Sequence, residues 1–209
     1  MTDPKRIYRL YQMQESGNCY KVRLLLHQLQ IPCECIEVDI LSGESRTEAF
    51  LEKNINGRVP TLQLDEEIYL PESNAILWYL AEDTPLLPRD KLARAKVLQW
   101  MFFEQYSHEP FIATSRFWIS ILQQADKFAD QIEAKRSGGE AALAVMNHHL
   151  KINDYFVADQ YTIADIALYA YTHVAEEGNF ELSPYPAITA WLTKVQSQVR
   201  HIRLPDAIT

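Results

Sequence analysis

The spacing of apolar residues changes once along this 209-residue chain, and that change limits the possible fold more than any other feature. Strand-like segments at 5–13, 35–40, 58–65 and 66–70 alternate with helical segments at 18–30 and 71–83. From residue 92 only helix-type spacing follows, at 92–124, about 126–156, 162–177 and 186–199. The pattern therefore predicts a small α/β domain followed by an all-helical domain.

Prolines at 85 and 88 mark the most linker-like stretch, which predicts domains at 1–82 and 91–209 joined by a linker at 83–90. In the first domain, the first two strands should be parallel and joined by the helix between them, and the last two should form a hairpin. In the second domain, Pro110 is expected to kink or break the first long helix.

Charge and composition exclude several classes of partner. The net charge is −8, from 20 Lys and Arg against 28 Asp and Glu, which disfavours nucleic acid and acidic membrane surfaces. The amino terminus lacks the apolar run of a signal peptide and no segment is long enough to span a bilayer, so a cytoplasmic protein is expected. Three cysteines, at 19, 33 and 35, are too few and too close for a disulfide framework, and no metal site is expected.

Residues 16–23, SGNCYKVR, lie where the first strand gives way to the first helix. The unbonded N–H groups and the positive dipole end of that helix should point at whatever lies over Ser16 and Asn18, which predicts a site for a small anion. Both residues are also favoured helix caps, so capping alone is the simpler interpretation.

A second motif, RVPTL at 58–62, begins the hairpin. Proline cannot donate to a sheet, so Pro60 belongs at the start of a strand. A cis Val59–Pro60 bond would turn the N–H and C=O of Val59 outward, where they could bind an extended peptide. An ordinary edge-strand proline is the alternative.

The third motif, PESNAI at 71–76, opens the next helix. The Ser73 hydroxyl, the N–H groups of the helix end and the Glu72 carboxylate together suit an amino-acid head group, with its carboxylate on the donors and its ammonium on Glu72. Serine and glutamate are also common first-turn residues, so capping is again the alternative.

Together these motifs resemble those of a cytosolic glutathione transferase of the bacterial type, with serine at the thiol-activating position. The first domain carries Ser16, Asn18, Lys21, Val22, NGRVP at 56–60 and ESNAI at 72–76. The second carries YTIAD, where Thr162 and Asp165 match the capping box of the family and Tyr161 with Ile166 fits a hydrophobic staple. The resemblance implies a thioredoxin-like glutathione-binding domain and an all-helical domain that carries the electrophile pocket.

The resemblance also implies roles for individual residues. Ser16 would donate a hydrogen bond to the glutathione sulfur, with Asn18 nearby. The remaining glutathione contacts would be Arg58, Val59, Glu72 and Ser73. Two departures from the family pattern occur: Ile55 stands where a proline is frequent, and Cys19 stands where the motif often has glycine.

The implied activity is transfer of glutathione, the co-substrate, to small hydrophobic electrophiles in detoxification, by a homodimer. Seven aromatic residues lie in the first long helix of the second domain, and most should be core because they cannot all face one pocket. By analogy with the family, Tyr106 and Phe111 are the first candidates for the pocket. Conjugation cannot be told from peroxidase, dehalogenase or isomerase use of the same thiolate.

Two other functions stay open. A glutathione-dependent oxidoreductase or peroxidase would use Cys19, but SxxC keeps only the second, usually more buried cysteine of a CxxC pair. A non-catalytic scaffold is the other possibility, because fold does not dictate function. Cys33 and Cys35 are expected to be inert packing residues.

Overall fold

The computed structural model describes residues 7–208 and contains two compact units. The first comprises the described residues up to Glu82 together with the tail from Val199 onward, and the second is Asp83–Gln198. The fold class expected from the sequence, a thioredoxin-like α/β domain and an all-helical domain, is confirmed.

The first unit is built on a four-stranded mixed sheet flanked by helices. Its elements are β1 (Tyr8–Gln12), α1 (Gly17–Leu29), β2 (Cys33–Glu37), η1 (Glu44–Arg46), α2 (Glu48–Leu51), β3 (Thr61–Asp65), β4 (Ile68–Pro71) and α3 (Ser73–Ala81). The strand order is β2-β1-β3-β4. β1 and β2 are parallel, and β3 and β4 form the expected antiparallel hairpin.

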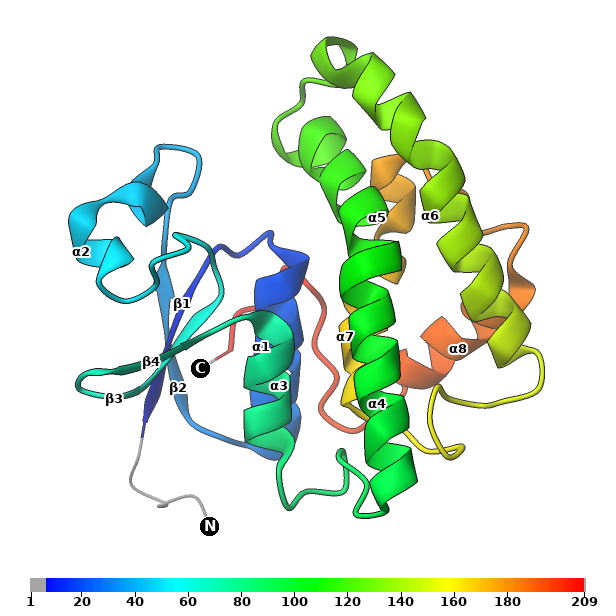
Figure 1. Cartoon of the computed structure of the whole chain (residues 1–209), viewed down its shortest axis with the longest axis horizontal. Coiled ribbons are helices and arrows are strands. Elements are labelled where there is room, and N and C mark those ends of the chain that lie inside the picture. Colours follow the sequence, from blue (N-terminus) through cyan, green and yellow to red (C-terminus); the bar gives the residue numbers. More distant parts are fainter. Residues whose placement is uncertain (1–6, 209) are drawn as a thin grey trace. The chain divides into compact units, whose positions relative to one another are not determined.

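Alternation along β1 assigns the two faces of the sheet. Leu10 is fully buried, and Gln12, two residues on, accepts a hydrogen bond from Arg23 of α1, so this face packs against α1. Tyr11 points to the other face, where its ring meets the Phe50 ring of α2 at 6.2 Å. In Figure 1, α1 and α3 lie together on one side of the sheet and α2 on the other.

β2 is shorter and begins earlier than the sequence predicts. Alternation of Ile36, Val38 and Ile40 indicated a strand over 35–40, whereas β2 spans Cys33–Glu37. Its ladder matches β1 residue for residue, so β2 ends where the five-residue β1 ends.

The carboxy-terminal tail belongs with the first unit, which differs from the sequence-based domain of 91–209. Three side chains on one face of α1 donate hydrogen bonds to backbone carbonyl groups of the tail: Tyr20 Oη to Ile202 at 2.6 Å, Arg23 Nη2 to Leu204 at 2.7 Å and His27 Nδ1 to Arg200 at 2.9 Å. These bonds satisfy backbone acceptors of an irregular segment, which is why the tail packs against this helix.

The second unit is built from helices joined by irregular segments, with one isolated β-bridge between Val157 and Gln160. Its elements are α4 (Lys91–Phe103), η2 (Glu104–His108), α5 (Glu109–Arg116), η3 (Phe117–Ile121), η4 (Asp126–Phe128), α6 (Ala129–Leu150), α7 (Ile163–Thr172), η5 (Ala175–Gly178) and α8 (Pro186–Gln196). The helical path does not break at Pro110, because a π-helical turn precedes it and it occupies the first turn of α5, where its missing N–H is tolerated.

α7 is the buried centre of this unit, since all ten of its residues are buried. The predicted capping box is present: Thr162 N donates to Asp165 Oδ2 at 2.9 Å, and Ala164 N donates to Thr162 Oγ1 at 3.3 Å. The Trp191 indole of α8 donates to Asp165 Oδ1 at 3.0 Å. Burial raises the pKa of Asp165 to about 6, although these hydrogen bonds act to lower it.

Replacing Asp165 by alanine should destabilise the second unit strongly. The carboxylate accepts from the N–H groups of Thr162 and Phe156 and from the Trp191 indole, and all three donors would be left buried and unpaired. We expect the free energy of unfolding at neutral pH to fall by about 3–5 kcal/mol, measured by chemical denaturation. The control is Asp130→Ala, in the exposed first turn of α6, which should cost less than about 1 kcal/mol. Similar losses in the two variants would contradict this account.

Candidate functional site

The register of the sheet gathers the predicted site segments at one end of it. Tyr11 of β1 pairs with Thr61 of β3, and Thr61 pairs with Pro71 of β4. The loop leaving β1, the residues entering β3 and the residues leaving β4 therefore meet at the same edge. These segments carry the three motifs, at 16–23, 58–60 and 72–76.

Ser16 is the N-cap of α1. Its Oγ accepts a hydrogen bond from the Cys19 amide at 3.3 Å, and its backbone is extended, as a cap requires. The capping role expected from the sequence is thus present. The capping bond uses an oxygen lone pair of Ser16, and the hydroxyl also interacts with the Cys19 thiol. Because Ser16 is half-exposed and its hydroxyl can rotate, it can cap the helix and still turn its proton toward an anion.

Asn18 and Ser73 join the amino ends of two helices. Ser73, the first residue of α3, donates from Oγ to Asn18 Oδ1 of α1 at 3.2 Å. Lys21 Nζ lies 3.4 Å from the same Oγ and donates to it, and the lysine is fully buried. One ammonium and two helix amino ends therefore make this region electropositive.

Glu72 lies immediately before this electropositive region. It is exposed, and its φ of 70° places it in the left-handed region that non-glycine residues rarely adopt. Its side chain makes no capping hydrogen bond to α3, so the carboxylate is not committed to the helix. Observed outliers of this kind concentrate at binding sites.

The segment before β3 presents an unused peptide group. The Val59–Pro60 bond is cis, which is the first of the two interpretations that the second motif left open. Among residues 7–208, no hydrogen bond uses the N–H or C=O of half-buried Val59. A neighbouring peptide in extended form would satisfy both groups.

The loop that leads to Val59 is fixed by Asn54. Its Nδ2 donates to the Arg58 carbonyl at 2.8 Å, and its carbonyl accepts from Gly57 N at 2.8 Å, which closes a turn with Ile55 inside it. A proline at 55 is therefore not needed for the turn. The side chain of Arg58 is exposed at the same edge of the sheet.

Cys19 is placed differently from a reactive thiol. It is fully buried, and its Sγ accepts from the Met13 amide at 3.5 Å. Burial raises the pKa of Cys19 to about 11, although hydrogen bonds from Ser16 and Met13 act to lower it. At neutral pH the thiol keeps its proton and is out of reach of solvent, which opposes a redox role.

Sequence reasoning missed the residues that hold the loop before Ser16. Arg23, fully buried on α1, donates to the Gln14 carbonyl at 2.9 Å and to Leu204 of the tail. The side-chain Nε2 of Gln14 donates to the Leu204 and Asp206 carbonyls at 3.3 and 3.2 Å. The sequence did contain a sign of this role, because Arg23 is a charged residue next to Val22 in a helix with an apolar face.

The two candidates for the electrophile pocket are not brought together. Tyr106 is 85% exposed. Phe111 faces α6, where its ring lies 5.7 Å from Lys135 Nζ and so close to Gly138 that a side chain there would collide with it. Of the seven aromatic residues expected to be mostly core, only Trp100 is buried, because the rings lie on different faces of the helix and Phe102 is 68% exposed.

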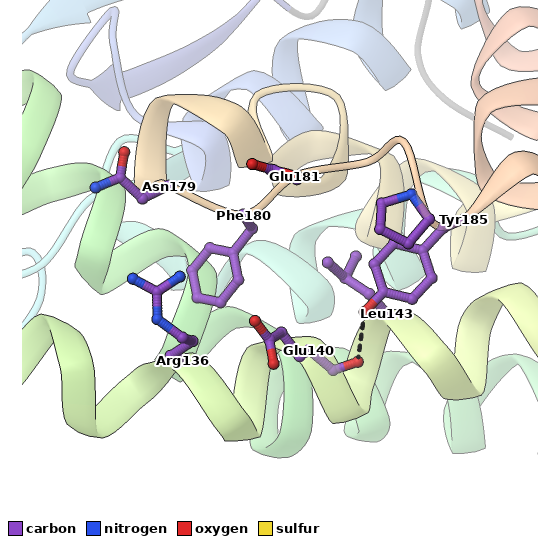
Figure 2. A pocket seen from close by; sticks show the side chains of 8 residues that line it. Arg136, Glu140, Leu143, Asn179, Phe180, Glu181 and Tyr185 are labelled. Carbon is purple, nitrogen blue, oxygen red and sulfur yellow. Dashed lines mark hydrogen bonds between the residues drawn. The ribbon is translucent and has the colours of Figure 1, made fainter.

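A cavity of about 300 Å³ lies within the second unit, away from these rings. Arg136 and Glu140 of α6 line one side, and Phe180 and Tyr185 line the other, with Tyr185 Oη donating to the Glu140 carbonyl at 3.3 Å (Figure 2). It contains none of the residues predicted to bind glutathione or an electrophile.

No three His, Cys, Asp or Glu side chains within 7–208 group so that they could hold a metal ion. None of the helices in that range has both the length and the apolar character needed to cross a membrane.

The fold defines a two-domain protein whose first domain is thioredoxin-like, and the candidate site at the edge where the three motifs meet includes the helix-capping Ser16. Models of the glutathione S-transferase N-terminal and C-terminal domains match residues 10–88 and 95–198. The chain therefore belongs to the glutathione S-transferase family and is a transferase of that family.

The relatives include proteins named as transferases and one named as an oxidoreductase. Glutathione S-transferase 1 of Schizosaccharomyces pombe is 33% identical over 84% of this chain and 80% of that protein. The disulfide-bond oxidoreductase YfcG of Escherichia coli is 28% identical over 87% and 86%. The crystal structure of a possible glutathione S-transferase from Rhodopseudomonas palustris superposes with a TM-score of 0.94 at 51% identity, covering 96% of this chain and 91% of that one.

Gly57 should be required for the loop that carries Val59. Its φ is +59°, and a Cβ there would lie 2.6 Å from Arg46 Nη1 and 2.8 Å from the Ser45 carbonyl oxygen. Gly43 is a matched control, because its φ is +87° but a Cβ there would meet nothing within 4 Å. We expect Gly43→Ala to lower the free energy of unfolding by about 1 kcal/mol and Gly57→Ala by about 2–3 kcal/mol, measured by chemical denaturation. Equal losses would show that the close approach has no effect.

Proposed function

We propose that the chain binds glutathione at the sheet edge described above, holds its sulfur as a thiolate and transfers the glutathionyl group to small apolar electrophiles. One observation carries the proposal: a half-exposed capping hydroxyl, an electropositive pair of helix ends and an unused peptide group converge at one edge of the sheet. A tripeptide thiol needs these three things, namely a donor for its sulfur, charges for its termini and a partner for its backbone.

The ligand would lie across the three motifs. The γ-glutamyl carboxylate fits the N–H of Ser73 at the start of α3 and the positive charge of Lys21, and its ammonium fits the carboxylate of Glu72, which makes no capping bond. The cysteinyl N–H and C=O would pair with Val59. Exposed Arg58 would then be the partner of the glycyl carboxylate.

Ser16 and the amino end of α1 can together supply the free energy needed to stabilise the thiolate. A free thiol has a pKa of about 8.5, and lowering it by about two pKa units requires about 2.7 kcal/mol. A hydrogen bond from a hydroxyl to an anion contributes about 1.5–3 kcal/mol and a helix end about 0.3–1 kcal/mol. No general base is required, and Asn18, two residues further along in the first turn of the same helix, would support the sulfur from the side.

The alternative is a glutathione-dependent oxidoreductase or peroxidase that uses Cys19, and one relative is named a disulfide-bond oxidoreductase. The burial and raised pKa of Cys19 oppose it. A non-catalytic scaffold is opposed by the convergence of the three motifs, because a scaffold has no need of an unbonded Val59 or an outlying Glu72.

The electrophile would be small and apolar, and Tyr106 remains the first candidate to contact it because its ring is open to solvent. Phe111 is the weaker candidate, since its ring already packs against α6. A role in detoxification and a cytoplasmic location complete the proposal.

The proposal includes a homodimer. Sedimentation velocity of the purified chain should give about twice the 24.2 kDa monomer mass at micromolar concentration. A monomer that persists as concentration rises would remove the dimer and leave the thiolate chemistry untouched.

Ser16→Ala should slow conjugation about ten- to a hundredfold without abolishing it. The variant loses the donor that holds the bound sulfur as an anion, but it keeps the helix end and the other contacts. The measurement is a pH titration of the ultraviolet absorbance of bound glutathione thiolate, together with conjugation rates under conditions where chemistry limits the rate. The pKa of the bound thiol should shift upward in the variant, and an unchanged pKa would exclude Ser16 as the activator.

Two control variants separate this role from others. Thr47→Ala removes an N-cap in the same domain, where Thr47 Oγ1 accepts from Phe50 N at 3.4 Å, and should leave the bound thiol pKa unchanged. Cys19→Ala removes the rival thiol and should retain conjugation. Loss of activity in Cys19→Ala with the fold and glutathione binding intact would favour the oxidoreductase instead.

A further inference from the structure

Two cysteines on β2 lie outside the site described above. In the parallel register Cys33 pairs with Tyr8 and Cys35 with Leu10, so both lie on the face of the sheet that packs against α1. β2 is an edge strand, and both cysteine side chains are half-buried rather than fully buried. They are therefore neighbouring thiols within reach of solvent, unlike Cys19.

The two thiols have different surroundings. Cys33 Sγ donates a hydrogen bond to the Glu34 carbonyl at 3.7 Å, so its proton is already in use. The neighbouring Cys33 thiol is the largest cause of a lowered pKa for Cys35, and the positive charge of Arg23 acts in the same direction, against burial and Glu37. The proximity of Cys35 and burial raise the pKa of Cys33. Cys35 is thus the sulfur that ionises first, and Cys33 keeps its proton.

The spacing of the pair permits a bridge that is easy to break. Positions two apart on a strand are separated by about 6.6 Å between Cα atoms, close to the upper limit of about 6.8 Å for disulfides. A bridge at that limit needs a local bend, which an edge strand allows because β1 flanks it on one side. Strained, accessible disulfides are the readily reduced ones.

We propose that Cys33 and Cys35 form a thiol–disulfide exchange site for small disulfides of the glutathione disulfide type, separate from the site at Ser16. The Cys35 thiolate attacks one sulfur of the disulfide, whose S–S bond breaks, so that a mixed disulfide forms on Cys35 and one glutathione thiolate leaves. Cys33 then gives up its proton and attacks the Cys35 sulfur, which expels the second glutathione thiolate.

Atoms and electrons balance over the two steps. The cysteines lose two electrons and two protons as the Cys33–Cys35 bond forms, and glutathione disulfide becomes two molecules of glutathione. Excess glutathione reverses both steps. The surroundings of the two thiols, rather than exposure alone, set the order of attack, because Cys33 donates its proton to the Glu34 carbonyl whereas Cys35 feels the positive charge of Arg23.

The test uses the full chain, reduced and then exposed to glutathione disulfide, with products read by intact mass and by peptide mapping. A glutamate-specific protease cuts after Glu34, between the two cysteines, so the halves stay joined only if the bridge has formed. The wild-type chain should lose two hydrogens and keep the halves joined. Cys33→Ser should instead accumulate glutathione on Cys35, and Cys35→Ser should react at least tenfold more slowly.

Two further variants act as controls. Cys19→Ala should form the bridge at the wild-type rate, since its thiol is buried, and Ser16→Ala should do so too, since the transferase site is not involved. Equal reactivity of Cys33→Ser and Cys35→Ser, a stable mixed disulfide in the wild-type chain without a bridge, or a bridge between two chains would each overturn the proposal. So would a chain whose cysteines stay unmodified until it is unfolded in denaturant.

Discussion

The buried guanidinium of Arg23 is the interaction on which the thioredoxin-like domain depends. A cation removed from water costs several kcal/mol unless hydrogen bonds compensate it. Arg23 donates to the Gln12 side chain, to the Gln14 carbonyl and to the Leu204 carbonyl. These acceptors belong to the end of β1, to the loop that leads to Ser16 and to the tail, so one charge fixes the position of all three.

The helix ends differ in how completely the chain itself satisfies them. At α7 the capping box is complete and buried, and Asp165 also accepts from Trp191, so this end is structural. At α1 the cap is half-exposed, and at α3 the side chain of Glu72 makes no capping bond. The same residue types therefore close a buried helix end in one domain and leave hydrogen-bonding capacity open to solvent in the other.

Sequence reasoning predicts the features that depend on side-chain pattern. The strand alternation, the hairpin and the capping box at Thr162 follow from residue type and spacing, and the structure has them. The tail on α1 could not be predicted, because its acceptors are backbone carbonyls, which every residue carries. The start and end of β2 also could not be predicted, since they are set by the length of its partner strand β1 rather than by its own apolar residues.

The candidate site divides in the same way. Residue types predicted a hydroxyl, a carboxylate and a proline-bounded peptide group, but not the buried Lys21 beneath Ser73. That contact joins residues 52 positions apart and depends on how α1 and α3 pack. Tyr106 and Phe111 show the limit most clearly, because aromatic spacing on one long helix does not say which ring a neighbouring helix will cover.

Sulfur chemistry in this domain is decided by the balance between burial and positive charge. Cys19 receives hydrogen bonds near the end of α1, yet complete burial outweighs them and keeps it a thiol. Cys35 is only partly buried and has the Cys33 thiol and Arg23 beside it, so its pKa is lowered. A glutathione sulfur beside Ser16 would share the helix end with Cys19 but not its burial. Two sulfur positions on one short helix can therefore have opposite protonation states, because desolvation decreases sharply between a fully buried residue and a half-exposed cap.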